Sequence, residues 1–537
     1  MRNQRRTKIR HTIATMLRYL LTFASAALAQ TPQDLPPSRF FSPKYSSIVL
    51  ADVGPWKITA QEFLLNYEYG PAFTKREADS KKHYLAYMVY EKLLALDGYS
   101  RNIETSPMVK EILRELEADF ATEELYKDDV LSKVKVSGAD IDRAVAKENI
   151  HLTLRWLFST SKDTIFREAR LLRDGVAFDS LFAAECPDSA AMENRSMAST
   201  KFRLEMKNPA LAAAVDTHTA GTVTPPIAAP DGWYIVNVSD VWKNAVVNEG
   251  EEMKMKEDVR RALVEHRSDS LSDQYVHRML LARNPVIEKE PFNLLAVWMG
   301  KKFLPPAKFD AWRLDSALAA SGTPLDPDSA GGWRSRILVR MTDGSLLFGD
   351  FLEWEKTRDP YIRLDLRSPH SFLVSVEDLI WRMVRDRTLA EEAYRRGLQK
   401  RENVAKQTRW WEEKLVYKAV RLAIDDSVQR DDSTVARYYR EHERDYRDDK
   451  GAVRPFRDVK DDVARDSFAY QETSLLLHKI LRLKEQYHVN VNDGELKRLH
   501  VDEENDPKAI DVYTVKKGGI FPHEAFPSID IEWQGWD

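Results

Sequence analysis

Two segments of this chain align with each other, and this internal repeat limits how the chain can fold. Residues 88–148 match residues 383–442 at an offset of 295 and then 294. Further on, residues 255–259 match residues 459–463, but there the offset is only 204. The first copy therefore holds about 90 residues that the second copy lacks. We predict a helical module that is present twice and is interrupted in its first copy by an inserted domain.

Both copies carry the sequence signals of helices rather than strands. Thr59, followed three residues later by Glu62, predicts a capped helix start, and Ser106-Pro107 predicts the start of another helix. Apolar residues at helical spacing follow Pro107, and residues 404–424 repeat that pattern in the second copy. Neither copy shows sustained alternation of apolar and polar residues, so a helical module is predicted.

The helix predicted after the insert indicates a discontinuous core. It lies near residues 254–281, and its counterpart in the second copy lies near 456–487. Because this helix returns only after the inserted domain, we expect segments 44–146 and 248–292 to pack together. Residues 300–333 are rich in proline and glycine, which predicts a linker between the copies.

The predicted fold class is multi-domain and mainly α, with an inserted α+β domain. In chain order we expect a signal peptide (1–29), the first part of the helical module (30–146), the insert (147–243), the helix that completes the first module (244–296), a linker (297–335), a second module without the insert (336–500) and a C-terminal tail (501–537). The apolar residues of the tail predict that it docks on another part of the chain; they are Ile520, Phe521, Phe526, Ile529, Ile531, Trp533 and Trp536.

The N-terminus has the parts of a secretory signal peptide. Basic residues between Arg2 and Arg10 precede an uncharged apolar stretch from Tyr19 to Ala29, which ends in Ala27-Leu28-Ala29. No later stretch approaches the roughly 18 to 20 apolar residues that a transmembrane helix needs. We therefore expect a soluble mature protein that is secreted across the inner membrane into the periplasm and is not inserted in a membrane.

Charge and cysteine content narrow the classes of function. The chain has 81 basic and 85 acidic residues, and residues 1–29 hold six of the basic ones and none of the acidic ones, so the mature chain has a net charge of −10. That balance argues against nucleic acid as a partner. Cys186 is the only cysteine, so no intramolecular disulfide can form. The sequence contains no metal-binding cluster, phosphate-binding glycine loop or nucleophile elbow, and we expect no metal and no cofactor.

The insert differs in pattern from the helical module. Leu152, Leu154, Trp156 and Phe158 alternate with less apolar neighbours, as in a strand. Helices are predicted at residues 165–174, at 178–185 and from Asn208-Pro209, and residues 232–238 form a closing strand. The predicted order is strand, three helices and strand over about 95 residues.

This order and three motifs resemble the parvulin (PpiC/rotamase) family of peptidyl-prolyl isomerases. The motifs cover about a fifth of the chain and are Arg155-Trp156-Leu157-Phe158, Gly175-Val176-Ala177-Phe178, and Gly221-Thr222-Val223-Thr224-Pro225-Pro226-Ile227 followed by Gly232-Trp233-Tyr234-Ile235-Val236. Together with the signal peptide and the helical module, they make the architecture similar to the SurA/PrsA class of extracytoplasmic folding factors. The resemblance implies a periplasmic chaperone whose partners are unfolded or extended polypeptides, with outer-membrane proteins among them.

At the positions where the family carries its catalytic residues, this sequence differs. Parvulins use two strand histidines together with a cysteine or aspartate. The first histidine position falls on Arg155, or on Trp156 if the strand slips by one residue, and the second falls on Tyr234. Asp188 matches the acidic position. We therefore expect a degenerate pocket at Arg155, Asp188 and Tyr234, with weak or absent isomerase activity.

Three functions remain open from the sequence. The first is a holdase whose helical modules bind aromatic-rich clients, with Trp233, Tyr234, Trp410 and Trp411 as candidate substrate-binding residues and Tyr417 beside them. The second is an active isomerase with an altered pocket, and the third is a structural partner of an envelope-assembly complex. The repeat favours the first function over the second, because the helical unit is present twice and the isomerase-like domain once.

Overall fold

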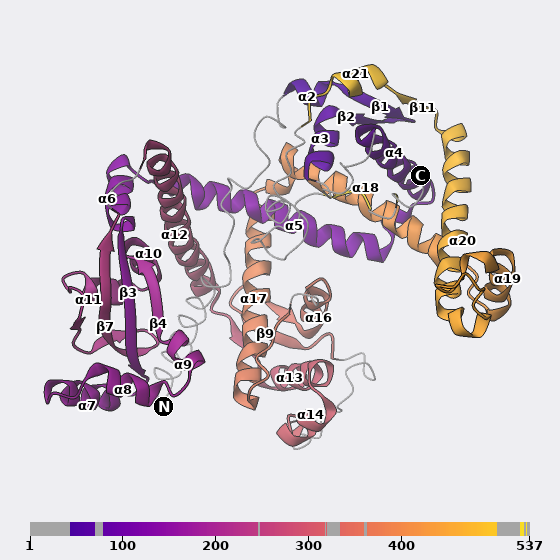
Figure 1. The fold of residues 1–537 in the computed structure, drawn as a ribbon. Coiled ribbons are helices and arrows are strands. Elements are labelled where there is room, and N and C mark those ends of the chain that lie inside the picture. The colour runs from indigo at the N-terminus through magenta and orange to yellow at the C-terminus, as the bar shows by residue number, and fades with distance from the viewer. Residues whose placement is uncertain are drawn as a thin grey trace. The chain divides into compact units, whose positions relative to one another are not determined.

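A computed structural model describes most of the chain beyond the N-terminus; it covers residues 43–69, 79–244, 248–316, 318, 333–358, 362–501, 527–530 and 533 (Figure 1). This part of the chain is mostly helical with antiparallel sheets, in agreement with the predicted mainly α class. None of its helices combines the length and the apolar character needed to cross a membrane. The predicted signal peptide lies outside the described residues.

The chain divides into two compact units, which are described separately. The first unit comprises Met1–Asp129 and Asp273–Asp537, and the second comprises Val130–Ser272. The division falls within the long helix α12 (Glu249–Arg283).

The first unit contains two runs of elements in the same order: two strands, two helices, a short 3-10 helix and a long helix. The first run is β1 (Val49–Val53), β2 (Trp56–Thr59), α3 (Ala60–Tyr69), α4 (Ser80–Ser100), η4 (Ile103–Thr105) and α5 (Pro107–Asp129). The second run is β9 (Ile337–Met341), β10 (Gly344–Leu347), α16 (Phe348–Lys356), α17 (Pro369–Arg395), η7 (Leu398–Lys400) and α18 (Glu402–Asp425). It continues through α19 (Asp432–His442), α20 (Phe456–Gln486), β11 (Val489–Val491) and α21 (Asp493–Arg498).

The sheet of the first run takes its third strand from the second run, and the sheet of the second run takes its third strand from the segment between the runs. The sheet orders are β11-β1-β2 and β10-β9-β8, where β8 (Val286–Ile287) follows α12. Val53 of β1 pairs with Val489 of β11, and Ile287 of β8 pairs with Val339 of β9. In Figure 1, β11 at the yellow end of the chain accordingly lies beside the indigo strand β1. Neither run completes its own sheet.

The two hydrophobic cores of the first unit differ in how they are assembled. The first core combines β1, β2, α3 and α4 with residues from α18, α20, α21 and the segment after α21; those residues are Tyr417, Val420, Leu476, Ile480, Leu483, Leu496, Leu499, Val501, Ile529 and Trp533. The second core combines Val276 and Leu280 of α12 with α13 (Lys289–Phe303) and with the segment from β9 to α17. At the centre, α5 packs against α18 and α17, while α18 packs against α4. The first core therefore needs residues from both runs, whereas the second core is built from residues 276–384.

This packing agrees only in part with the arrangement that the sequence predicted, because Ala144 does pack with Val259 and Leu263 of α12. Segments 44–146 and 248–292 were expected to share one core, but Val276, Leu280 and β8 lie in the core of α17, whereas α4 packs against α18. Tyr275 of α12 packs near Ala121 and Leu125 of α5. Periodicity shows which face of a helix is buried but not which of two similar partners covers it, and this explains the difference.

The segment predicted as a linker contains helices. Residues 297–303 form the end of α13, and α14 (Pro306–Trp312) follows. Met299 and Leu304 are buried in the second core. Pro305 and Pro306 do not interrupt a helix here, because they occupy the N-cap and first-turn positions, where a proline ring is tolerated.

The described part of the tail docks on the first core, as the sequence predicted. Ile529 and Trp533 are 5% and 1% exposed and belong to that core. The other apolar tail residues named above lie outside the described residues.

In the second unit, a strand opens and a strand closes the segment that resembles parvulins. Its antiparallel sheet has the order β4-β3-β7-β5, with β6 also paired to β7. The strands are β3 (Ile150–Ser159), β4 (Ser196–Thr200), β5 (Thr222–Val223), β6 (Ile227–Ala229) and β7 (Gly232–Lys243). The helices are α7 (Lys162–Arg173), α8 (Phe178–Glu185), α9 (Ser189–Asn194), α10 (Lys201–Lys207) and α11 (Pro209–Val215).

Helices cover both faces of this sheet. Leu204 of α10 and Leu211 of α11 pack on one face, whereas Ile165 of α7 and Phe182 of α8 pack on the other. Phe202 of α10 packs instead with α6 (Gly138–Glu148) and with the first part of α12. The parvulin-like motifs on β3 and β7 therefore lie at the centre of a sheet that is covered on both sides.

Candidate functional site

The pairing of β3 with β7 shows which of the predicted pocket residues share a face of the sheet. Phe158 pairs with Tyr234 and Trp156 pairs with Val236, so Trp156 and Tyr234 face the same side. Arg155 lies between these positions in the alternation and faces the opposite side. The structure thus places Trp156, not Arg155, on the same face as Tyr234. Of the two alignments that the sequence left open, the one that slips by one residue fits this geometry.

Arg155 makes contacts with the helices that cover its own face. Its guanidinium lies 5.6 Å from the centre of the Phe178 ring and 5.4 Å from that of Phe182, and its Nη1 is 2.8 Å from Asp179 Oδ1. Its Nε also donates to Ser239 Oγ at 3.2 Å. These partners occupy the guanidinium on the face that Tyr234 does not reach.

Tyr234 is a buried core residue with a hydrogen-bonded hydroxyl. It is 8% exposed and packs against the Phe158 ring at 4.9 Å, and its hydroxyl donates to Asp231. Burial, followed by the hydrogen bond and the charge of Asp231, raises the pKa of Tyr234 above its ordinary value. The phenol is therefore a neutral donor at physiological pH, and its proton is already engaged.

Asp188 acts as a helix cap. Its Oδ1 accepts from the backbone N–H of Ala191 at 2.8 Å at the start of α9, and the residue is exposed. Its neighbour Cys186 is 1% exposed, and burial raises the pKa of that thiol. The structure does not bring Arg155, Asp188 and Tyr234 together as one pocket.

A pair of glutamates near Phe158 of β3 was not identified from the sequence. Glu168 lies on α7, and Glu185 is the last residue of α8. Glu185 Oε2 accepts from the backbone N–H of Phe158 at 3.3 Å and lies 3.7 Å from Arg195 Nη1. Burial, with the charge and a hydrogen bond of Glu185, raises the pKa of Glu168 to about 7. Because the two carboxyls come from separate helices, no spacing in the sequence signals this pair.

The four predicted aromatic binding residues are buried (Tyr234 and Trp411) or partly buried (Trp233 and Trp410). Trp233 and Tyr234 are consecutive in β7 and therefore face opposite sides; Trp233 lies 5.4 Å from the Phe166 ring. Trp411 is 9% exposed in a core that also contains Val109 and Phe120 of α5. These positions do not form one surface for a client.

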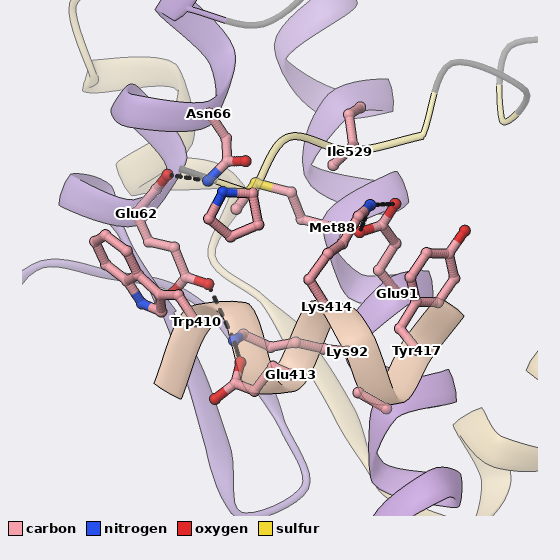
Figure 2. A pocket seen from close by; sticks show the side chains of 12 residues that line it. Glu62, Asn66, Met88, Glu91, Lys92, Trp410, Glu413, Lys414, Tyr417 and Ile529 are labelled. Atoms are coloured by element: carbon pink, nitrogen blue, oxygen red, sulfur yellow. Dashed lines mark hydrogen bonds and ion pairs between the residues drawn. The ribbon is translucent and has the colours of Figure 1, made fainter. Parts of the chain in front are cut away.

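Trp410 instead lines a small cavity in the first unit, between α3, α4, α18 and the tail (Figure 2). The cavity has a volume of about 60 Å³, which has room for on the order of four water molecules. Its lining residues are Glu62, Asn66, Met88, Glu91, Lys92, Ala95, Trp410, Glu413, Lys414, Tyr417, Pro527 and Ile529. It is too small for a large side chain of a bound peptide.

Two buried lysines cross this cavity in opposite directions, as Figure 2 shows. Lys92 of α4 lies 3.0 Å from Glu62 and 2.7 Å from Glu413 of α18. Lys414 of α18 lies 2.7 Å from Glu91 of α4. Burial raises the pKa values of Glu62 and Glu91, and the nearby lysine opposes that rise in each case. The charges hold the two runs of elements together.

A wider cleft lies beside this network in the first unit, with walls from both runs. It has a volume of about 380 Å³ and is lined by Trp56, Tyr99, Glu117, Gln399, Ala405, Thr408, Arg409 and Glu412. Gln399 Oε1 and Thr408 Oγ1 are buried without a hydrogen-bond partner. The lining combines the rings of Trp56 and Tyr99 with the carboxylates of Glu117 and Glu412 and the guanidinium of Arg409.

Comparisons with known proteins return structural similarities only. No protein-family model and no curated protein matches the chain. The peptidylprolyl isomerase PrsA from Bacillus anthracis aligns at 15% identity with 36% of this chain and 96% of its own, with a TM-score of 0.23. PrsA from Bacillus cereus aligns at 16% identity with 44% of this chain and 90% of its own, with a TM-score of 0.22. The foldase protein PrsA from Lactococcus lactis aligns at 12% identity with 43% of this chain and 93% of its own, with a TM-score of 0.19. The chain is similar to these proteins over part of its length, and scores of this size assign it neither a fold nor an activity.

Proposed function

We propose that this protein is an extracytoplasmic folding factor that holds extended, non-native polypeptides, and that its parvulin-like domain has weak or no isomerase activity. The observation that carries the proposal is the sheet of the second unit. There, Tyr234 of the closing motif pairs with Phe158 on one side and with Ile227 of the Gly221–Ile227 motif on the other. Three separate stretches that resemble parvulins are thereby adjacent in space.

The side chains at the two histidine positions support weak catalysis. Rotation about a prolyl bond is accelerated by groups that bind the twisted amide better than the planar forms. Trp156 and Tyr234 replace both imidazoles, and the phenol of Tyr234 already donates to Asp231. Arg155 and Asp188 are the residues that would have to replace the missing histidines in catalysis. Arg155 already forms an ion pair with Asp179, and Asp188 already caps α9.

Isomerisation of a prolyl peptide and suppression of client aggregation should be measured on the same purified mature chain. We expect efficient suppression with a peptide rate near the uncatalysed one, and Tyr234→Phe should leave both unchanged. A fast isomerisation that is lost in Tyr234→Phe would establish the competing function, an isomerase with an altered pocket.

The client surface that we propose lies on α20. A holdase needs apolar side chains that remain accessible to solvent. Tyr470, Leu477 and Leu481 are 57%, 40% and 59% exposed, and their spacing of seven and four residues places them on one helix face. This location replaces the one expected from the sequence, because Trp411 and Tyr417 are buried.

Matched triple variants test this location. Replacing Tyr470, Leu477 and Leu481 by serine should abolish most aggregation suppression, because it removes the exposed apolar face. The control replaces Phe166, Met192 and Trp242 of the second unit, which are 40%, 40% and 49% exposed, and should retain activity. The opposite result would place client binding in the parvulin-like domain and refute the surface on α20.

Two further parts of the proposal concern the origin and location of the chain. We infer that the two runs of elements are copies of one module, because α5 and α18 begin 295 residues apart and occupy equivalent places in the order of elements. We also infer export into the periplasm with cleavage after Ala29, and N-terminal sequencing of the exported protein tests this. An N-terminus upstream of Arg10 in the exported protein would contradict it.

A further inference from the structure

The described part of the tail lies in a groove between α4 and α18, which we call the tail groove. It is formed by Tyr90 and Glu91 of α4 and by Lys414, Tyr417 and Arg421 of α18. The Trp533 ring lies 5.7 Å from that of Tyr90 and 6.1 Å from that of Tyr417. Trp533 is 1% exposed, so the groove encloses the indole almost completely.

Three kinds of group in the tail make polar contacts with the groove. Glu91 Oε1 accepts from the backbone N–H of Asp530 at 2.8 Å and from Trp533 Nε1 at 3.1 Å. The carboxylate of Asp530 accepts from the Tyr417 hydroxyl at 2.7 Å and lies 3.0 Å from Lys414 Nζ and 3.1 Å from Arg421 Nη1. A main-chain amide, a carboxylate and an indole are thus recognised together, as in the binding of a short peptide.

The groove keeps its charges paired without the tail. Besides its contact with Asp530, Lys414 lies 2.7 Å from Glu91, and Arg421 lies 3.0 Å from Glu472 of α20. Departure of Asp530 therefore leaves neither cation without a carboxylate, which avoids the large cost of an unpaired buried charge. The cavity of about 60 Å³ beside Pro527 and Ile529 also shows that the tail fills the groove incompletely.

We propose that the tail groove is a peptide-binding site for extended segments in which an aromatic residue follows an acidic one by three positions, and that the C-terminal segment of this chain occupies it in cis. Asp530 and Trp533 supply this pattern in the chain itself. The inference deepens the proposed function and rests on it in one respect. The ligand that competes with the tail for the groove is a segment of the same chemistry in a non-native client. The tail then limits access to the groove until a client displaces it.

A labelled peptide of residues 527–537 provides the test, added to the full-length mature protein and to its Asp530→Ala/Trp533→Ala variant. Because a tethered ligand competes at high effective concentration, the peptide should bind the variant at least tenfold more tightly than the unaltered protein. A control peptide with alanine at the position of Trp533 should bind neither. Adding Arg421→Gln to the variant should weaken binding again, and circular dichroism confirms that each variant is folded.

Equal peptide binding by the unaltered protein and the folded variant would overturn the inference, as would no binding to the variant. If the double variant unfolds, Asp530→Asn alone serves, with a smaller gain in affinity expected and no gain refuting the proposal. If the variant shows no gain in peptide affinity but the unaltered protein suppresses aggregation, the inference fails and the proposed function stands. If the unaltered protein does not suppress aggregation, the proposed function is refuted, whatever the result of the peptide experiment.

Discussion

The sheets of the two units are assembled in opposite ways. In the second unit, every strand of the five-stranded sheet comes from residues 150–243, and the first residue of β3, Ile150, pairs with the last residue of β7, Lys243. In the first unit, β1 pairs with β11 more than 400 residues away in the sequence, whereas β8 pairs with β9 about 50 residues away. The sheet of the second unit is therefore completed within one segment of the chain, whereas the first run of the first unit completes neither its sheet nor its core without residues of the second run.

This difference has consequences for folding. The contacts of the first unit close long loops, which slows folding more than it lowers stability. Buried ion pairs link the same two runs, since Glu115 of α5 lies 3.0 Å from Arg358 and 3.2 Å from Arg387. Such pairs lose their compensation when one partner is absent, so an isolated run would expose both apolar surface and unpaired charge.

The largest effect should follow from breaking the charge network between the runs. Lys92→Met leaves Glu62 and Glu413 without the cation that lies 3.0 and 2.7 Å from them, and we expect a loss of about 3–5 kcal/mol in the free energy of unfolding. Denaturant titration at pH 8 measures it. The exposed Lys418→Met provides the control, and equal losses in the two variants would show that the network contributes nothing.

The same variant should depend on pH in a defined direction. Burial raises the pKa of Glu62 even with Lys92 present, and removal of the cation can only raise it further. A carboxyl with a raised folded-state pKa stabilises the fold when protonated and loses that contribution as the pH rises. The deficit of Lys92→Met should therefore be smaller at pH 5 than at pH 8.

The next effect concerns the exchanged core. Leu476 of α20 is fully buried in the core of β1 and α4, so Leu476→Ala should cost about 2–5 kcal/mol. Hydrogen exchange should accelerate in β1, more than 400 residues away in the sequence. Leu477→Ala is the matched control, because Leu477 is 40% exposed, and should change stability by no more than about 0.5 kcal/mol. Unchanged exchange in β1 would refute the dependence of this core on α20.

The sequence predicted the positions of helices and strands better than it predicted which of them pack or pair with one another. The cap of α3 is present, since Thr59 Oγ1 accepts from the backbone N–H of Glu62 at 3.2 Å, and α5 begins at Pro107 as expected. The exchange of β8 and β11 was not predicted, because two or three extended residues after a helix carry no alternation to detect. Two runs of helices with similar apolar faces also give no signal for which run covers which face.

The same limit applies to the candidate site. The resemblance located β3 and β7 correctly, but it left open whether Arg155 or Trp156 stands opposite the closing motif, and only the register of the strands separates them. Trp410 and Trp411 are adjacent in the sequence, yet one lines a cavity and the other lies in a core. The pair of Glu168 and Glu185 depends on how two helices pack, which no spacing in the sequence encodes.

A smaller effect should arise in the self-contained sheet. The pKa of Glu168 is raised from 4.5 to about 7, so the folded state binds its proton more tightly than the unfolded state does. That contribution is complete below pH 4.5 and is lost as the pH rises through 7. Because Glu168 is partly exposed, we expect about 1 kcal/mol after solvent screening.

Glu168→Gln tests this pH dependence through local hydrogen exchange of β3 at pH 5 and pH 8. The variant should be more stable than the unaltered protein at pH 8. Its stability should also fall less between pH 5 and pH 8. Glu193→Gln, at an exposed position, should change neither. A variant with the same pH dependence as the unaltered protein would show that the carboxyl pair is not the source.

The smallest effect on the first unit should come from the largest deletion. The backbone N–H of Asn244 donates to the carbonyl of Asn149 at 3.2 Å, so a short Gly-Ser bridge can replace residues 150–243 without moving α6 or α12. Val259→Ser and Leu263→Ser belong in the same variant, because both side chains pack around Phe202, which the deletion removes. Exchange in β1 should stay within about 0.5 kcal/mol of the unaltered protein, as for a change remote from its core. If β1 instead loses protection as it does in Leu476→Ala, the parvulin-like domain supports the exchanged cores, and the contrast between a self-contained and an interleaved region fails.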